Sequence, residues 1–162
     1  MTTDTNPNTE LGKLNQEDRE VLLRAPAIVA LLAAVSDDGE VSAHERSEAI
    51  RLSHLRTYTS PEILHNYYKE VDQVFEDYLN QEFEKLPQEK EEKAIYLAER
   101  LKALDKVLPK LNQVYSKELV ISLKSFARHV FKTNSGFLEH FLLPIFLGRI
   151  QRDFFDPKIG DE

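Results

Sequence analysis

Apolar residues recur at three- and four-residue steps from Ile63 to Phe83, and this spacing constrains the fold more than any other feature of the chain. Such steps place side chains on one face of an α-helix, whereas a half-buried strand needs strict alternation. Ser60 and the adjoining Pro61 suit the start of this helix as its N-cap and first-turn residue. Pro87 should end it, because proline cannot continue the helical hydrogen bonds. The pattern predicts a long amphipathic helix whose tyrosine and phenylalanine stripe belongs to the core.

Helix signals also fill the rest of the chain, whereas alternating strand patterns are almost absent. Asn15 and Asp18 are expected to cap the first helix. Within it, Pro26 should either break the helix, which then restarts at that point, or kink it. The next helix is expected to bury Ile50 and Leu55. Beyond the amphipathic stretch, helices are predicted at residues 43–55 and 88–108, from Ser116 onward, and through the apolar segment "FLEHFLLPIFLGRI". The sequence therefore predicts an all-α protein, a compact bundle of six to eight helices joined by short turns.

The composition argues against several classes of function. Without cysteine, the chain has no disulfide, no thiolate metal site and no cysteine nucleophile. A formal net charge of -7 argues against nucleic-acid binding, which relies on a basic footprint to displace counterions. No apolar run approaches the roughly 18 residues of a spanning helix, and the first residues lack the basic start and apolar run of a secretion signal. We therefore expect a cytoplasmic protein that is not an integral membrane protein.

The stretch "SDDGEVSAHE", residues 36–45, gathers acidic side chains around Gly39 between two apolar helical runs. From Asp38 to Glu45 it matches the second half of an EF-hand loop, in which a glycine permits the sharp turn and the last glutamate returns a carboxylate to the cation. The first half does not match, because Ala34 stands at the opening ligand position. These residues predict a weak site for a divalent cation such as Ca²⁺. Its candidate ligands are Asp37, Asp38, Glu40 and Glu45.

A purely structural interpretation explains the same residues. Asp38 and Gly39 form an ordinary turn pair. Ser42 and Glu45 have the spacing of a capping box, in which the glutamate carboxylate binds the helix N-terminus. On this alternative the chain is a protein-interaction or scaffold domain with no metal site, and the sequence leaves both hypotheses open.

The Ala-rich run, the Asp-Gly turn and the glutamate just inside the next helix together resemble the signature of the TerB-like tellurite-resistance family. The stretch "SPEILHNYYKEVDQVFEDYL" is similar to that family's central helix, and "FARHVFKTNSGFLEHFLLPI" falls where a second copy of the signature belongs. This second copy lacks the acids, because Asn134, Ser135 and Leu142 occupy their positions. The resemblance implies a compact, all-α, cytoplasmic bacterial protein without catalytic activity, linked to tellurite resistance and related stress responses. It also implies metal ions at acidic turns and protein partners, some of them membrane-associated.

The resemblance, which spans roughly residues 20–150, also suggests how the chain is organised. Aligning Gly39 with Gly136 reveals a pseudo-repeated helix-turn-helix. We expect a disordered N-terminal lead at residues 1–14, a single TerB-like helical domain at residues 15–153, and a flexible tail at residues 154–162.

Charge is segregated along the second half of the chain. Residues 70–99 hold ten acidic residues against three lysines, whereas residues 100–132 hold eight basic residues against two acidic ones. Basic residues at helical spacing on two consecutive helices define a candidate surface for an acidic protein partner or an anionic membrane. The alternative is an ordinary solvated helix face. The candidate partner-binding residues are Lys102, Lys106, Lys110, Lys124, Arg128 and Lys132.

No motif of the sequence points to an enzyme. The chain contains no nucleophile elbow, no P-loop and no dinucleotide-binding glycine motif. Glu62 and His65 form a single Glu-x-x-His step, but a carboxylate-bridged di-iron site needs two such steps and two further glutamates. The sequence therefore predicts a non-enzymatic protein with no catalytic residues.

Overall fold

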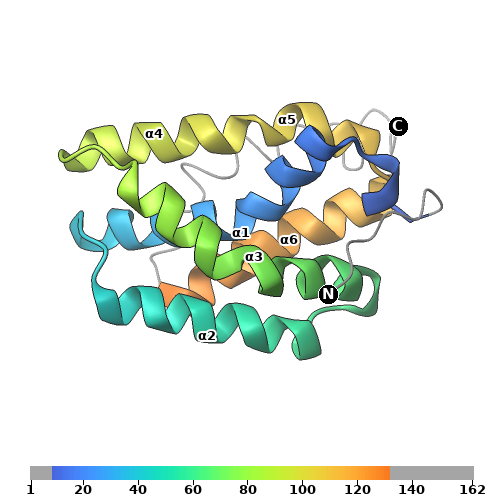
Figure 1. Ribbon diagram of the computed structural model, residues 1–162, viewed down its shortest axis with the longest axis horizontal. Coiled ribbons are helices and arrows are strands. Elements are labelled where there is room, and N and C mark those ends of the chain that lie inside the picture. The colour runs from blue at the N-terminus through green and yellow to red at the C-terminus, as the bar shows by residue number, and fades with distance from the viewer. Residues whose placement is uncertain (1–8, 132–162) are drawn as a thin grey trace, which may run out of the picture.

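A computed structural model describes residues 9–131, apart from the side chains of Asp37, Asp38, Val130 and Phe131. Within this range every regular element is helical, which confirms the all-α prediction. The longer helices are α1 (Gln16–Asp38), α2 (Ala43–Thr59), α3 (His65–Glu84), α4 (Lys90–Lys102) and α6 (Gln113–Phe131). Figure 1 shows α4 along one edge of the bundle and α2 along the opposite edge, with α1, α3 and α6 between them.

The composition of α1 explains its central position. Every side chain from Ala27 to Val35 is apolar and buried. A helix that is apolar on all sides must be enclosed by its neighbours, and α1 packs against α3, α4 and α6. Its first turn is capped as predicted, because Oδ1 of Asn15 accepts the N–H of Asp18 at 2.7 Å.

Pro26 lies inside α1, and the helix continues through it. Proline has no N–H, so the carbonyl of Leu22, four residues earlier, lacks its usual helical donor. The hydroxyl of Tyr67 on α3 donates to that carbonyl at 2.8 Å, and both residues are buried. Of the two predicted alternatives, a break with a restart is therefore wrong, because a neighbouring helix supplies the missing donor, and a kink at Pro26 stays a prediction.

The passage from α2 to α3 also differs from its prediction. α2 extends to Thr59. Leu55 is 40% exposed, so the prediction that Leu55 belongs to the core is wrong. The reason is that α2 is an edge helix whose outer face meets solvent. Ser60 does not act as an N-cap, because the one-turn 3-10 helix that follows, η2 (Glu62–Leu64), has no side-chain cap. Ile63, the first residue of the predicted apolar stripe, lies in η2 and is 43% exposed, so the buried stripe does not begin there. Within α3 the stripe is buried as predicted at Tyr67, Tyr68, Val71, Phe75 and Leu79.

The helix predicted over residues 88–108 is divided in the structure. α4 ends at Lys102, and after a turn at Ala103 the chain forms the single-turn α5 (Leu104–Val107) and the 3-10 helix η3 (Leu108–Lys110). Pro109 lies in η3, where it ends the helical run. The basic residues of this segment therefore do not share one continuous helix.

α6 begins at Gln113, three residues before the predicted start at Ser116. The side chain of Asn112 acts as the cap, since its Oδ1 accepts the N–H of Val114 at 2.9 Å. The hydroxyl of Ser116 instead donates to the carbonyl of Leu108 at 2.9 Å. A buried serine thus joins α6 to η3, and the prediction of Ser116 as a helix start is wrong.

Residues 9–14 are part of the fold, so the predicted disorder of residues 1–14 is wrong for this portion. The 3-10 helix η1 (Leu11–Lys13) buries Leu11, and Leu14 is buried beside it. Residues 9–131 hold five helices longer than one turn, and α5 is a single turn, so the predicted bundle of six to eight helices is not confirmed. The predicted helix "FLEHFLLPIFLGRI", residues 1–8 and the predicted tail lie outside the described residues.

Candidate functional site

The acidic turn joins α1 to α2 at Gly39. This residue has a φ of 82°, in the left-handed region that favours glycine, and its N–H donates to the carbonyl of Val35 at 2.8 Å. A Cβ at this position would lie 3.2 Å from the side chain of Lys90 at the start of α4. Glycine is therefore required both by the backbone conformation and by the close approach of α4.

Glu45 lies in the first turn of α2 and caps the N-terminus of that helix. Its Oε1 accepts the N–H of Ser42 at 2.8 Å, and Oγ of Ser42 accepts the N–H of Glu45 at 3.0 Å. These two bonds form the predicted capping box. A carboxylate that turned toward a cation would have to give up its bond to the N–H of Ser42.

A lysine of α4 contacts the same turn. Nζ of Lys93 donates to the carbonyl of Gly39 at 2.7 Å. Lys93 and Glu40 line a cavity of about 300 Å³ beside the turn, where Glu40 is exposed. The ammonium group places a positive charge among the oxygens that a divalent ion would need, and this charge opposes such an ion.

Of the four predicted ligands, only Glu40 and Glu45 have described side chains. The side chains of Asp37 and Asp38 lie outside the described structure, and Glu45 is held in its capping box. Among the side chains that are described, no group of three or more histidine, aspartate or glutamate residues is placed to hold a metal ion. The cation site stays a prediction, whereas Glu45 has a structural role.

The predicted basic residues lie on separate elements. Three follow the edge formed by α4, α5 and η3, and two belong to α6. They are Lys102, Lys106 and Lys110 on the edge, and Lys124 and Arg128 on α6. Nζ of Lys102 lies 3.8 Å from Glu99, and Lys110 pairs with Asp18, so two of the edge lysines have acidic partners. Lys132 lies outside the described residues.

The sequence analysis missed a buried charge network around Glu82, whose side chain is fully buried. Arg100 donates to its carboxylate through Nη2 at 2.6 Å and Nε at 3.1 Å. Nη1 of Arg24 donates to it at 3.1 Å, and the hydroxyl of Tyr96 at 3.3 Å. The sequence did contain a signal for this network, because Glu82 lies three residues after Leu79 on the apolar stripe of α3. A carboxylate on a buried stripe needs a buried partner.

This network has a structural role. It joins α1, α3 and α4 through one carboxylate, both of whose oxygens accept hydrogen bonds. The hydrogen bond to Glu82 raises the pKa of Arg100, so the guanidinium stays charged. We therefore assign the network no chemistry.

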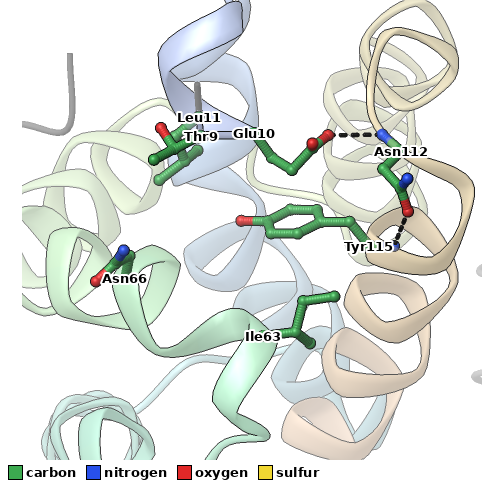
Figure 2. A pocket seen from close by; sticks show the side chains of 7 residues that line it. All are labelled: Thr9, Glu10, Leu11, Ile63, Asn66, Asn112 and Tyr115. Atoms are coloured by element: carbon green, nitrogen blue, oxygen red, sulfur yellow. Dashed lines mark hydrogen bonds between the residues drawn. The ribbon is translucent and has the colours of Figure 1, made fainter. Parts of the chain in front are cut away.

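A cavity of about 400 Å³ lies between η1, α3 and the start of α6 (Figure 2). The ring of Tyr115 projects into it, and Asn66 lies across from that ring. The carboxylate of Glu10 accepts the N–H of Asn112 at 2.6 Å and pairs with Lys13 at 2.7 Å. Burial acts to raise the pKa of Glu10, but these two hydrogen bonds and the charge of Lys13 lower it below its ordinary value. Glu10 is thus unsuited to act as a general base near neutral pH.

A second cavity, of about 340 Å³, lies between α2 and α6 and contains a different set of polar groups. Nη1 of Arg56 donates to Oγ of Ser122 at 3.1 Å. Nη2 of Arg56 donates to Oγ of Ser125 at 3.2 Å and to Nδ1 of His129 at 3.3 Å. Ser122 also shares a hydrogen bond with the hydroxyl of Tyr68. No sequence signal could have found this group, because Arg56 and Ser122 are 66 positions apart.

The Glu-x-x-His step is explained by local structure. Glu62 is exposed, and Nε2 of His65 lies 2.8 Å from the carbonyl oxygen of Ser60. Since a carbonyl only accepts, the ring nitrogen is the donor. His65 therefore closes the turn before α3.

Comparison with protein-family models, with curated proteins and with solved structures finds no match for this chain. The resemblance to the TerB-like family therefore rests on the motifs of the sequence and stays a prediction. Among the described residues, no helix combines the length and the hydropathy that crossing a membrane requires.

Proposed function

We propose that the chain is a non-enzymatic, TerB-like interaction module that docks an acidic segment of a partner protein on α6. Of the two hypotheses raised by the acidic turn, the geometry favours the interaction domain. Glu45 caps α2, so one of the four predicted ligands is already used, and Lys93 places a positive charge on the carbonyl of Gly39 in the same turn. The resemblance to TerB supports a role in tellurite resistance or a related stress response, exerted through partners.

The exposed face of α6 is the observation that carries this proposal. Val114 and Ile121 are 56% and 49% exposed, which is high for large apolar side chains. The helix has Glu118 as its single acidic residue. Its basic residues are Lys117, Lys124 and Arg128, which together with Ile121 follow one another at steps of three and four. An apolar side chain thus stands within a basic row.

Charge complementarity identifies the kind of partner. The chain carries a formal net charge of -7, so a basic helix face is a local exception in an acidic protein. Such a face attracts acidic segments and repels basic ones, which accelerates association and selects partners. The apolar side chains add contact area worth about 25 cal/mol per Å² buried.

Fluorescence anisotropy with a labelled peptide of glutamate and leucine tests this docking. The double substitution Lys124→Glu and Arg128→Glu should weaken binding about tenfold or more, because repulsion replaces attraction at two contacts. Lys102→Glu with Lys106→Glu is the matched control, since it reverses two charges on the α4–α5 edge. Equal losses in both double variants would contradict the proposal, because attraction would then depend only on total charge.

The cation hypothesis has its own experiment. The protein is titrated with Ca²⁺, Mg²⁺, Mn²⁺ and Zn²⁺ while the amides of Gly39 and Glu45 are followed by NMR. We expect no saturable shift at millimolar metal in the natural chain. A response confined to Lys93→Ala would show that the lysine excludes the ion, whereas saturation in the natural chain would restore the cation site as the leading hypothesis.

A further inference from the structure

Arg56 places a positive charge in the cavity between α2 and α6, and none of the carboxylates that the structure describes pairs with it. Arg24 and Arg100 both bind Glu82, whereas Arg56 forms no ion pair within the described residues. Glu118 lines the same cavity but does not pair with it. Charged groups that are partly withdrawn from water are normally paired, so this arrangement is suited to an anion from outside the chain.

The neighbours of Arg56 present further donors to the cavity. Oγ of Ser125 accepts from Arg56, so its own proton can be donated to a ligand. Nδ1 of His129 also accepts from Arg56, which places the proton of the neutral ring on Nε2 as a second donor. The bond between Tyr68 and Ser122 holds the remaining hydroxyl in place beneath the guanidinium.

We propose that this cavity binds a carboxylate through Arg56, Ser125 and His129. One guanidinium balances one negative charge, and Glu118 in the lining opposes a second. A singly charged carboxylate therefore fits better than a doubly charged phosphate. Nη2 of Arg56 already donates to Ser125 and His129, so the carboxylate would accept from the remaining N–H groups of Arg56 and from the donors of Ser125 and His129. A volume of about 340 Å³ accommodates an aspartate or glutamate side chain.

The position of the cavity connects it to the docking face of α6. Ile121 lines the cavity and also stands in the basic row of α6. This part of the inference rests on the proposed function: an acidic side chain of the docked segment would enter the cavity and bind Arg56. The pocket thus supplies a position-specific contact that a basic helix face alone lacks.

Propionate, which carries a single carboxylate and matches the end of a glutamate side chain, serves as the probe, and the amide of Ser125 and the ring of His129 are followed by NMR. We expect saturable shifts with propionate and weaker binding of inorganic phosphate. Arg56→Lys keeps the charge but loses the guanidinium N–H groups that hold Ser125 and His129, and it should weaken propionate binding about tenfold or more. Arg51→Lys is the matched control, because Arg51 lies on the same helix, is exposed and pairs with Glu48. Unchanged affinity in Arg56→Lys, or tighter binding of phosphate than of propionate, would overturn the carboxylate assignment.

A further variant and a competition measurement distinguish this inference from the docking proposal and from a loss of fold. Ser125→Ala leaves Arg56 in place and should also weaken propionate binding, at an unchanged unfolding temperature. If the acidic peptide needs Lys124 and Arg128 but binds normally to Arg56→Lys and is not displaced by propionate, docking stands and the pocket is wrong. If propionate binds in an Arg56-dependent manner while no peptide binds, the pocket stands and docking is wrong.

Discussion

Replacing Tyr67 with phenylalanine tests how α1 continues through Pro26. The substitution removes only the hydroxyl that donates to the carbonyl of Leu22 at 2.8 Å. The ring can keep its edge-to-face contact with Tyr68, whose centroid lies 4.9 Å away. Burial raises the pKa of Tyr67 well above its ordinary value, so the hydroxyl is protonated at neutral pH and able to donate. The variant therefore isolates one hydrogen bond.

Tyr67→Phe should lower the free energy of unfolding by about 1–3 kcal/mol, because the carbonyl of Leu22 becomes a buried acceptor without a donor. Pro26→Ala adds an N–H that can donate to the same carbonyl. Proline costs about 3 kcal/mol inside a helix, but the substitution also removes two buried methylenes worth about 0.8 kcal/mol each. Pro26→Ala alone should therefore stabilise the protein by about 1 kcal/mol. In that background Tyr67→Phe should cost at least about 1 kcal/mol less than in the natural chain.

Urea unfolding of the natural chain, both single variants and the double variant, followed by circular dichroism, measures this coupling. Tyr58→Phe is the control, because Tyr58 is 73% exposed and its loss of a hydroxyl should change stability by less than about 0.5 kcal/mol. An equal cost of Tyr67→Phe in both backgrounds would refute the reasoning, since the carbonyl of Leu22 would then not depend on Tyr67.

Three further predictions use the same unfolding measurement. Glu82→Gln should cost about 1–3 kcal/mol, because it removes the charge from a buried carboxylate that Arg24 and Arg100 bind, while both guanidinium groups remain partly exposed. Glu84→Gln on the exposed side of α3 should cost less than about 0.5 kcal/mol, and similar losses would contradict a buried network. Gly39→Ala should cost about 1–2 kcal/mol, because its φ of 82° is unfavourable for a residue with a Cβ and that Cβ would approach Lys90 at 3.2 Å. The pKa of Glu10 is lowered in the folded state, so its stabilising contribution is present above its unfolded-state pKa and is lost as the pH falls through its folded-state pKa. The difference in free energy of unfolding between the natural chain and Glu10→Gln should therefore shrink on acidification. A constant difference would exclude this role.

The elements that the sequence predicted correctly depend on residues close together in the chain. The cap of Asn15 on the N–H of Asp18 and the capping box of Ser42 and Glu45 each join residues three positions apart. The buried stripe of α3 follows from helical periodicity alone. Where local signals compete, the predictions fail: Ser116 has the chemistry of a cap, but Asn112 takes that role because the chain leaves η3 at that point.

The candidate sites depend on contacts that no local pattern contains. Asp38 and Gly39 indicated a turn, and the sequence left open whether it binds a cation; the contact of Lys93 with the carbonyl of Gly39 comes from α4, 54 positions away. The carboxylate pocket around Arg56 likewise forms only where α2 packs beside α6.

The sequence by itself determined that this protein is helical, where α1 and α2 begin, and which face of α3 is buried, because hydrogen bonds and periodicity within a helical turn encode these features. Only the tertiary structure decided that α1 passes intact through Pro26, that Glu82 is enclosed by two arginines, and that Arg56 faces a cavity. The physical reason is separation along the chain: the hydrogen bonds responsible join residues 45, 58 and 66 positions apart, and such partners are chosen by how whole helices pack.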